Sequence, residues 1–240
     1  MTLLSVESVS KSFRGLRAVA DASFDVEEGG IVALIGPNGA GKTTIFNVVA
    51  GVYAPDSGSI RLGSERVDGL RPHQVCAAGI GRTFQVVKPF AGLTVLDNVI
   101  VGALKREPRV EHARRDALGI LERIGLAARW DQPAASLTLP DRKRLEVARA
   151  LATRPRLLLL DEVMAGMRPT ECDRMVEVFQ ALNRDGLTIL LIEHVMRAVM
   201  ALAQRVVVLN HGQIIANGTP AEVVRDPAVL ECYLGEEAEV

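Results

Sequence analysis

The sequence predicts a mixed α/β fold, and three patterns along the chain indicate it. Residues 1–62 alternate short strand-like apolar runs with turns. From Val95 to Leu126, and again from Arg142 to Ala152, apolar residues recur at three- and four-residue intervals, which is typical of helices. Continuous apolar runs then follow, and runs of this length separated by helical segments indicate buried parallel strands. They are Leu157–Leu160, Thr188–Ile192 and Val206–Leu209.

The N-terminal part is expected to hold four strands. They are Leu3–Val9, Ala22–Val26, Ile31–Ile35 and Ser59–Leu62, the last of which follows a turn at residues 55–58. A helix is expected from Thr44 to Ala50, directly after the third strand and a glycine-rich loop. A strand, a glycine-rich loop and a helix in this order are typical of a phosphate-binding site.

The loop after Ile31–Ile35 matches the pattern G-x-x-x-x-G-K-[ST]. Glycines let the backbone curl so that successive N–H groups point at phosphate oxygens, and the following helix adds the positive end of its dipole. We expect Lys42 to reach the β- and γ-phosphates and the Thr43 hydroxyl to bind Mg²⁺. The residues predicted to bind the nucleotide here are Gly36, Pro37, Asn38, Gly39, Ala40, Gly41, Lys42, Thr43 and Thr44.

Composition excludes several classes of protein. With 28 basic and 29 acidic residues, the chain has no electrostatic footprint for nucleic acid, and 4% aromatic residues are too few for a base-stacking platform. The mean hydropathy of +0.20 is high, yet no apolar stretch approaches the length of a membrane span. The first ten residues do not read as a signal peptide, and Cys76, Cys172 and Cys232 share no metal or disulfide spacing. We therefore expect a cytosolic protein with reduced thiols that docks on a partner.

A second candidate site lies where the apolar run Leu157–Leu160 ends in two acids. Asp161 is expected to bind Mg²⁺, directly or through water, because a strand end beside a phosphate-binding loop is where the metal is held. Glu162 projects differently and is expected to polarise the water that attacks the γ-phosphate. Two acids after a strand are often only a solvated strand end, but the phosphate-binding loop favours the catalytic interpretation.

These motifs and four further segments make the chain resemble the ATP-hydrolysing subunits of ABC transporters over essentially its whole length. It is most similar to the ATPases of branched-chain (hydrophobic) amino-acid importers, and the ATPases of urea import and lipopolysaccharide export look similar. The segments that carry the likeness are Gly81–Gln85, Leu93–Val99, Arg144–Leu151 and Ile192–Met196.

The resemblance implies a P-loop nucleoside triphosphatase core with a small antiparallel β subdomain and an inserted α-helical subdomain, the ABC ATPase fold. Residues 1–240 are expected to form a single ATP-binding domain. Within it, residues 1–85 and 155–240 would form the nucleotide-binding core with a C-terminal extension. Residues from about 86 to 154 would form the helical subdomain that carries the signature segment.

The resemblance also implies roles for single residues. Phe13 stands where an aromatic ring stacks on adenine, with an ordinary core Phe as the alternative. Gln85 falls where the family has a glutamine that contacts the metal and the attacking water. His194, after Thr188–Ile192, matches the histidine that contacts the γ-phosphate and holds Glu162 and water in position. ATP and Mg²⁺ are the expected ligands. The other histidines are expected in exposed helix positions (His73, His112) and in a turn (His211).

The chain departs from the family pattern in two places. The signature, usually Leu-Ser-Gly-Gly-Gln, is replaced after Leu137 by Thr138, Leu139, Pro140 and Asp141. Thr138 keeps the hydroxyl that would contact a γ-phosphate across a dimer, whereas Pro140 has no N–H to offer. Asp141 adds a negative charge where the family usually has a neutral Gln, which is good for capping a helix and poor for approaching ATP, so this signature is expected to serve the slower site. In the loop after the acids, Val163 and Arg168 replace the usual Pro and Asp or Asn.

The leading functional hypothesis is the ATPase motor of a membrane importer, a dimer that holds each ATP between one subunit's P-loop and the other's signature helix. The expected partners are transmembrane permease subunits, a second ATPase (identical or a paralogue) and a substrate-binding protein acting through the permease, without nucleic acid. The expected location is the cytoplasmic face of the cell (inner) membrane, as a peripheral subunit. Phe90, in the expected surface loop Val86–Phe90, should make an apolar contact beside the groove for a permease helix, with a locally buried Phe as the alternative.

Two other classes of protein fit the sequence less well. A soluble ABC ATPase acting on nucleic acid or ribosomes commonly has two cassettes or a long coiled-coil insert, and neither feature occurs in this sequence. A P-loop kinase would need a phosphoacceptor site and a lid, and the signature-like helix and His194 argue against it.

Overall fold

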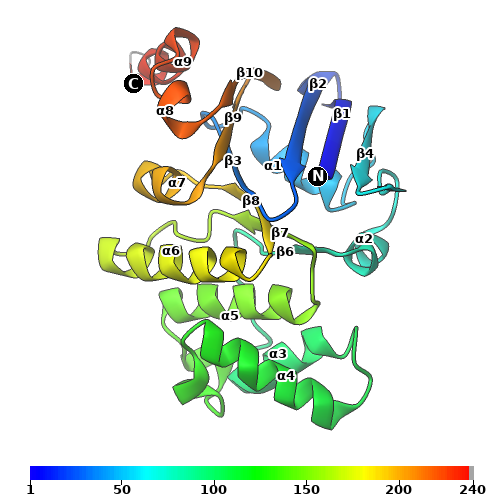
Figure 1. The fold of residues 1–240 in the computed structure, drawn as a ribbon, viewed down its shortest axis with the longest axis vertical. Coiled ribbons are helices and arrows are strands. Elements are labelled where there is room, and N and C mark those ends of the chain that lie inside the picture. The colour runs from blue at the N-terminus through cyan, green and yellow to red at the C-terminus, as the bar shows by residue number, and fades with distance from the viewer. Residues whose placement is uncertain (238–240) are drawn as a thin grey trace.

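The computed structural model describes residues 1–237, which form two β-sheets with helices around them (Figure 1). The smaller sheet has the strand order β2-β1-β4-β5, and its strands pair antiparallel. They are β1 (Thr2–Phe13), β2 (Leu16–Glu27), β4 (Ser57–Leu62) and β5 (Glu65–Arg66). The turn between β1 and β2 consists of Arg14 and Gly15, whose φ angles of 47° and 88° match the twist of a tight hairpin.

The larger sheet has the strand order β10-β9-β3-β8-β7-β6, and every neighbouring pair is parallel except β10 with β9. Its strands are β3 (Ile31–Ile35), β6 (Ile80–Arg82), β7 (Leu157–Asp161), β8 (Thr188–Ile192), β9 (Arg205–Asn210) and β10 (Gln213–Gly218). The predicted strands Ile31–Ile35 and Thr188–Ile192 have the same bounds in the structure. No pattern in the sequence predicts β6, which is very short, or β10, which lies partly exposed at the sheet edge.

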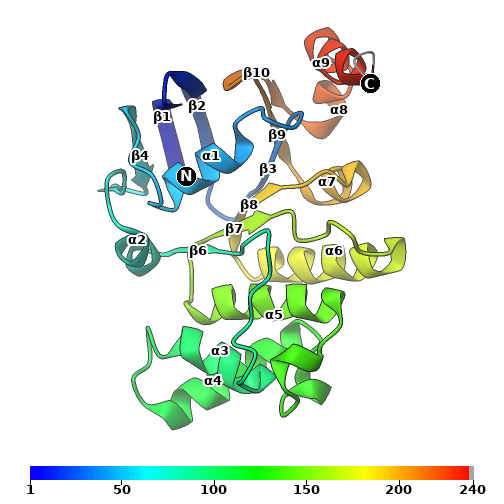
Figure 2. The same ribbon diagram turned by 180° about the vertical axis from the view of Figure 1, so that it is seen from behind.

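Helices cover both faces of the larger sheet and build a lobe at one end of the molecule (Figure 2). Around the sheets lie α1 (Lys42–Val49), α2 (Pro72–Ala78), α6 (Pro169–Arg184), α7 (Met196–Leu202), α8 (Pro220–Val223) and α9 (Pro227–Glu237). The helical lobe consists of α3 (Val95–Ala103), α4 (Val110–Arg123) and α5 (Leu139–Ala152), with the 3-10 turns η1 (Ala127–Arg129) and η2 (Ala134–Ser136). It lies far from the β1–β2 hairpin (Figure 1).

Three predicted helices have other bounds in the structure, and the smallest difference is in α1, which spans Lys42–Val49 where the pattern predicts Thr44–Ala50. The helical stretch expected from residue 95 to 126 is divided, because α3 ends at Ala103 and α4 begins at Val110. Pro108 lies in the connection, and proline disfavours the helical conformation of the residue before it. The helix expected from Arg142 begins at Leu139, because Thr138 caps it by accepting the backbone N–H of Asp141.

The strands of the larger sheet are buried on both faces. Ile31, Ala33 and Ile35 join an apolar cluster with the helices α3 to α7, whereas Val32 and Leu34 join a second cluster with β1, β2 and α1. This two-sided burial explains why the strands are continuous apolar runs. It also fixes the carboxyl ends of β3, β7 and β8, where ligands bind in sheets of this kind.

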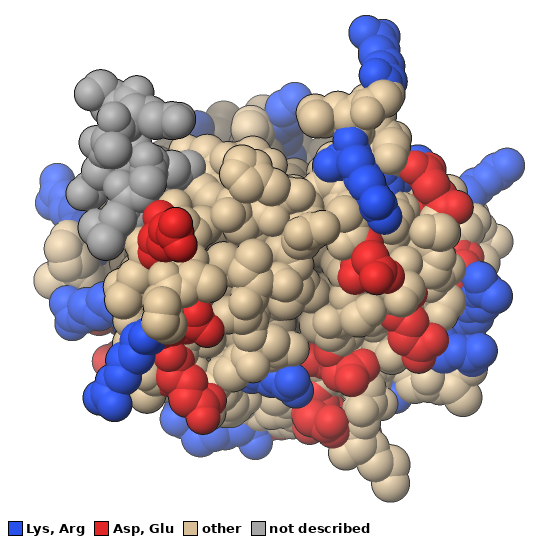
Figure 3. Space-filling view, turned by 90° about the horizontal axis from the view of Figure 1, so that it is seen from above, with Lys and Arg blue, Asp and Glu red and all other residues tan. Residues whose placement is uncertain are grey.

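Two surface properties bear on how the molecule meets its surroundings. On the face that carries β10 and the β1–β2 hairpin, acidic and basic side chains both lie around the rim and a central area carries neither (Figure 3). Among residues 1–237, no helix has both the length and the apolar character needed to cross a membrane.

Candidate functional site

The phosphate-binding loop connects β3 to α1, and its backbone requires glycine at specific positions. A Cβ on Gly36 would lie 2.0 Å from a backbone carbonyl oxygen of β9, and one on Gly41 would lie 2.4 Å from one of β2. Gly41 also has a φ of 103°, in the region that favours glycine. The ammonium of Lys42 donates hydrogen bonds to the carbonyl oxygens of Gly36 (2.6 Å) and Pro37 (2.7 Å). The loop therefore curls around the lysine, as phosphate capture requires.

Phe13 ends β1, and 37% of the residue is exposed. Its ring meets the ring of Tyr53 edge-on, with 5.0 Å between centroids and an interplanar angle of 71°. Tyr53 follows α1, and its backbone N–H donates to the Asn47 carbonyl oxygen at 3.2 Å. This half-exposed aromatic pair beside the end of the P-loop helix is compatible with stacking on a base, and Tyr53 is a second candidate that the sequence did not single out.

A cavity of about 470 Å³ brings together the side chains expected to hold Mg²⁺: Thr43, Gln85 and Asp161 all line it. Asp161, at the end of β7, is 1% exposed, and its Oδ1 is buried with no hydrogen-bond partner among the described residues. Burial raises the pKa of the Asp161 carboxyl, while the ion pair with Arg82 at 2.9 Å opposes the rise. A buried carboxylate oxygen without a partner, next to hydroxyl and amide oxygens, is the donor set that Mg²⁺ prefers.

Glu162 lies between Gln85 and His194. Gln85 Nε2 donates to Glu162 Oε2 at 2.7 Å, and His194 Nε2 lies 2.8 Å from Glu162 Oε1. The structure thus joins three residues from separate segments that the sequence could connect only by resemblance. Because Gln85 uses its amide nitrogen here, its Oε1 is the atom that can serve a metal.

Arg82 is a site residue to which the sequence pattern assigns no role. Its guanidinium pairs with Asp161, donates to Asn47 Oδ1 at 2.6 Å, and lies 5.5 Å from the centroid of the Phe84 ring. Asn47 is in α1, so Arg82 connects the P-loop helix to the strand that carries Asp161. Arg82 is a cation at the end of β6, and β6 pairs with β7, the strand that ends in Asp161. Because β6 is so short, the sequence pattern does not reveal that these two strands are neighbours.

The signature segment begins α5, and the structure corrects one expectation about it. Asp141 does not face outward as a bare charge: it is 6% exposed, and its carboxylate pairs with Arg129 (3.1 Å) and Arg144 (3.4 Å). The Thr138 hydroxyl donates to Asp141 Oδ2 at 2.9 Å, so the acid belongs to the helix cap. Leu139, by contrast, is 49% exposed.

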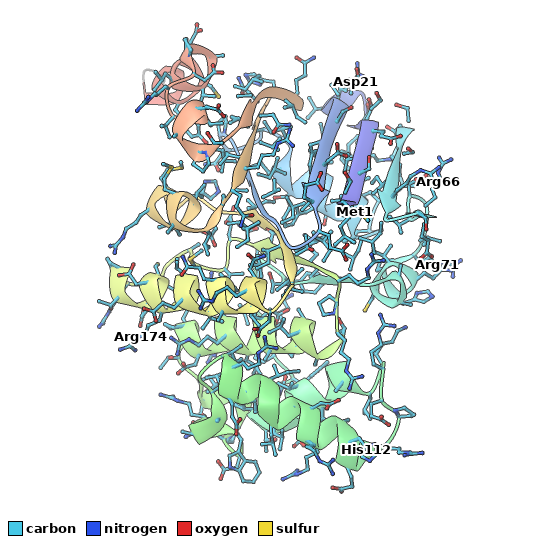
Figure 4. The ribbon with its side chains drawn as sticks, viewed as in Figure 1. Met1, Asp21, Arg66, Arg71, His112 and Arg174 are labelled. Carbon is cyan, nitrogen blue, oxygen red and sulfur yellow. The ribbon has the colours of Figure 1, made fainter. Side chains whose placement is uncertain are left out.

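The remaining histidines lie outside this group of side chains. His112 is in α4, at the far end of the helical lobe (Figure 4), where its ring lies 3.5 Å from the Glu107 carboxylate. His211 stands in the turn between β9 and β10 with a φ of 45°. His73 is exposed in α2.

Comparison with known proteins gives matches along the whole chain. Residues 19–165 match the family model described as ABC transporter, and residues 213–239 match the one described as branched-chain amino acid ATP-binding cassette transporter. The high-affinity branched-chain amino acid transport ATP-binding protein LivG of Salmonella typhimurium is 41% identical, covering 98% of each chain. The lipopolysaccharide export system ATP-binding protein LptB of Escherichia coli is 35% identical, covering 99% of each.

A solved structure has the same fold. The ADP conformation of MJ1267, an ATP-binding cassette of an ABC transporter, superposes with a TM-score of 0.89 at 30% identity, covering 98% of this chain and 99% of that one. The fold class and the family predicted from the sequence are thereby confirmed. The chain belongs to the ATP-binding subunits of the ABC transporter family, and it is an ATPase that drives transport.

Proposed function

We propose that this chain powers an importer of branched-chain or other hydrophobic amino acids, with Glu162 as the general base for ATP hydrolysis. The observation that carries the hydrolytic part is the Glu162 carboxylate, held by Gln85 at 2.7 Å and His194 at 2.8 Å at a strand end beside the P-loop. The cargo is supported by the likeness to LivG and by the match at residues 213–239. The likeness to LptB supports lipopolysaccharide export less strongly.

Binding of ATP would begin at the P-loop. Lys42 would exchange its hydrogen bonds to the Gly36 and Pro37 carbonyls for oxygens of the β- and γ-phosphates. Thr43, Gln85 and Asp161 fit a magnesium ion, which would neutralise charge on those phosphates. Phe13, whose ring makes a T-shaped contact with Tyr53, would stack on the adenine.

Hydrolysis needs a base aligned with the attacking water. As the water oxygen bonds to the γ-phosphorus, Glu162 takes up a proton and the bond to ADP breaks. Gln85 fixes one oxygen of the carboxylate, and the Nε2–H tautomer of His194 fixes the other, so the base is oriented before the water arrives. His194 is 43% exposed at its side chain, which leaves it accessible to a γ-phosphate.

The positions of the P-loop and of the signature segment in one chain favour a dimer. α1 packs on one face of the larger sheet and α5 on the other, so the Thr138 segment at the start of α5 and the P-loop of one chain lie on opposite sides. A second subunit, identical or a paralogue, would bring its signature to this chain's ATP. Residues 1–85 and 155–240 would act as the nucleotide-binding core, and residues from about 86 to 154 as the helical subdomain.

A permease would dock at a second cavity, of about 270 Å³, whose lining is mainly apolar and includes Val52, Val75, Phe90 and Val101. Phe90 is 43% exposed, and the Arg149 guanidinium lies 4.6 Å from its ring centroid. A short amphipathic permease helix fits such a groove. The chain would then lie peripherally at the cytoplasmic face of the membrane, with a substrate-binding protein acting through the permease.

Docking is testable by crosslinking to the copurified permease, in a background where Cys76, Cys172 and Cys232 are serine. Lys88→Cys should crosslink, and Arg174→Cys, on the distant helix α6 (Figure 4), should not. Failure of Lys88→Cys to crosslink in an assembled complex would count against this groove.

The hydrolytic proposal is tested by Glu162→Gln, which keeps shape and hydrogen bonding but removes the base. Steady-state hydrolysis should be abolished while ATP binding persists, and an ATP-bound dimer should accumulate on size-exclusion chromatography. Glu122→Gln, at an exposed position of α4, is the matched control and should hydrolyse normally. Near-normal turnover of Glu162→Gln would contradict the assignment of Glu162 as the general base.

A further inference from the structure

Two buried charged side chains lie behind the catalytic carboxylate, and the chemistry above does not use them. Lys143, near the start of α5, is 6% exposed, and Glu193, directly after β8, is 2% exposed. Lysine and glutamate are almost never buried to this extent unless they are paired. Their contacts are therefore informative about function.

Lys143 contacts the backbone of Glu162. Its Nζ donates to the Glu162 carbonyl oxygen at 2.8 Å, and the Glu162 N–H donates to the carbonyl oxygen of Ile192 at 2.9 Å. Glu162 has a φ of 49°, a conformation that residues other than glycine adopt infrequently. Both polar backbone groups of this residue are thus fixed from outside its own loop, one by α5 and the other by β8.

Glu193 contacts the same loop two residues further on. Its Oε1 accepts the backbone N–H of Met164 at 2.8 Å, and its Oε2 is buried with no hydrogen-bond partner among residues 1–237. Burial raises the pKa of the Glu193 carboxyl and lowers the pKa of Lys143, and each charge opposes the shift of the other. The two side chains therefore help each other to stay charged inside the protein. Glu193 also directly precedes His194, the second contact of the Glu162 carboxylate.

We propose that Lys143 and Glu193 are positioning residues for ATP hydrolysis, which hold the loop Glu162–Met164 so that the Glu162 carboxylate stays between Gln85 and His194. Neither touches the reacting atoms. Lys143 lies about 7.5 Å along α5 from Thr138, so a shift of the helix when Thr138 meets the partner's ATP would move the Glu162 backbone. This link between the two ATP sites rests on the proposed function.

The test compares Lys143→Met, Glu193→Gln and the double variant in the full chain. It measures kcat at saturating Mg-ATP with radiolabelled ATP, the Kd of a fluorescent ATP analogue, and the melting temperature. Each single variant should lower kcat about 10- to 100-fold, the size expected for a small misalignment of a catalytic group, without a matching change in Kd. Lys143→Arg keeps a donor and should recover most of the rate.

The double variant separates positioning from charge balance. Removing both buried charges should recover part of the melting temperature, because each charge attracts the other and removing one alone leaves the second without that attraction. If the residues position Glu162, kcat stays low despite partly restored stability. Recovery of kcat together with the melting temperature, or single variants with unchanged kcat, would overturn the proposal.

Two controls keep the result interpretable. Arg174→Met removes an exposed cation on α6 and should leave kcat and Kd unchanged. Glu162→Gln tests the proposed function separately: if it hydrolyses ATP normally, the assignment of the base is wrong. If it is inactive while Lys143→Met and Glu193→Gln are fully active, only the positioning proposal fails.

Discussion

Arg82→Met is the substitution whose effect follows most directly from the structure. It removes the partner of Asp161, a carboxylate that is 1% exposed and 2.9 Å from the guanidinium. It also removes the hydrogen bond to Asn47 and the cation–π contact with Phe84. The main effect is an uncompensated buried charge, because desolvation already raises the pKa of Asp161 and Arg82 is the group that opposes it most.

The magnitude can be worked out before the experiment. Breaking a buried ion pair by removing one partner costs about 3–5 kcal/mol. An unfolding entropy of about 2.1 cal/mol/K per residue gives about 0.5 kcal/mol/K for 240 residues. The nucleotide-free melting temperature should therefore fall by about 6–10 °C.

Circular dichroism or differential scanning fluorimetry at a fixed scan rate measures this shift. The double variant Arg82→Met with Asp161→Asn removes both charges and should recover most of the loss, since replacing a whole buried pair is often neutral. A fall of less than about 2 °C in the single variant would refute the reasoning. So would a double variant that is no more stable than the single one.

Three further predictions concern binding, pH and the signature. Lys42→Ala should weaken the binding of a fluorescent ATP analogue about 10- to 150-fold, which corresponds to the free energy of one charged hydrogen bond. Unchanged affinity together with unchanged turnover would contradict the P-loop assignment. Burial raises the pKa of Glu146, so its contribution to stability is complete below about pH 4 and is lost as pH rises through the raised pKa. Glu146→Gln should therefore remove one contribution that lowers the melting temperature as pH rises from acid to neutral, and an unchanged pH dependence of the melting temperature would be inconsistent with that shift. Replacing Leu139, Pro140 and Asp141 by Gly-Gly-Gln should raise the ATPase rate of the chain alone, and a lower rate would contradict the idea of a slow signature.

The parts of the fold and site that the sequence predicts are those encoded locally. The P-loop needs only the glycines and Lys42 within one short segment, and strands β3 and β8 need only uninterrupted apolar runs. Asp161 and Glu162 are visible because they end such a run. The hydrogen bond between Gln85 and Glu162 depends instead on β6 lying next to β7, and a three-residue strand leaves no periodic signal.

Buried charges are the second kind of feature that the sequence hides. Lys143 and Glu146 stand among the charged residues of α5, where a sequence pattern indicates a solvated face, yet both are at least 94% buried in the structure. Which charged side chains of a helix are buried depends on neighbours contributed by β6, the loop after β7 and the loop after β8. Those neighbours are remote in sequence, so propensity and spacing carry no information about them.

Asp141 shows that an altered motif cannot be interpreted from the sequence alone when remote residues surround the altered side chain. Compared position by position, it is an acid in place of a neutral signature residue, which suggests repulsion of ATP. In the structure it accepts the Thr138 hydroxyl and pairs with Arg129 and Arg144, so Thr138 and Asp141 cap the helix together and two guanidinium groups balance the charge. The start of α5 is therefore locally self-consistent without the family's glycines. What the substitutions change is the surface offered to a second subunit: an exposed Leu139 and a proline without an N–H, in place of two glycine backbones. Any slowing of hydrolysis at the partner's site should accordingly arise from the missing donor and the added bulk, and not from the charge of Asp141.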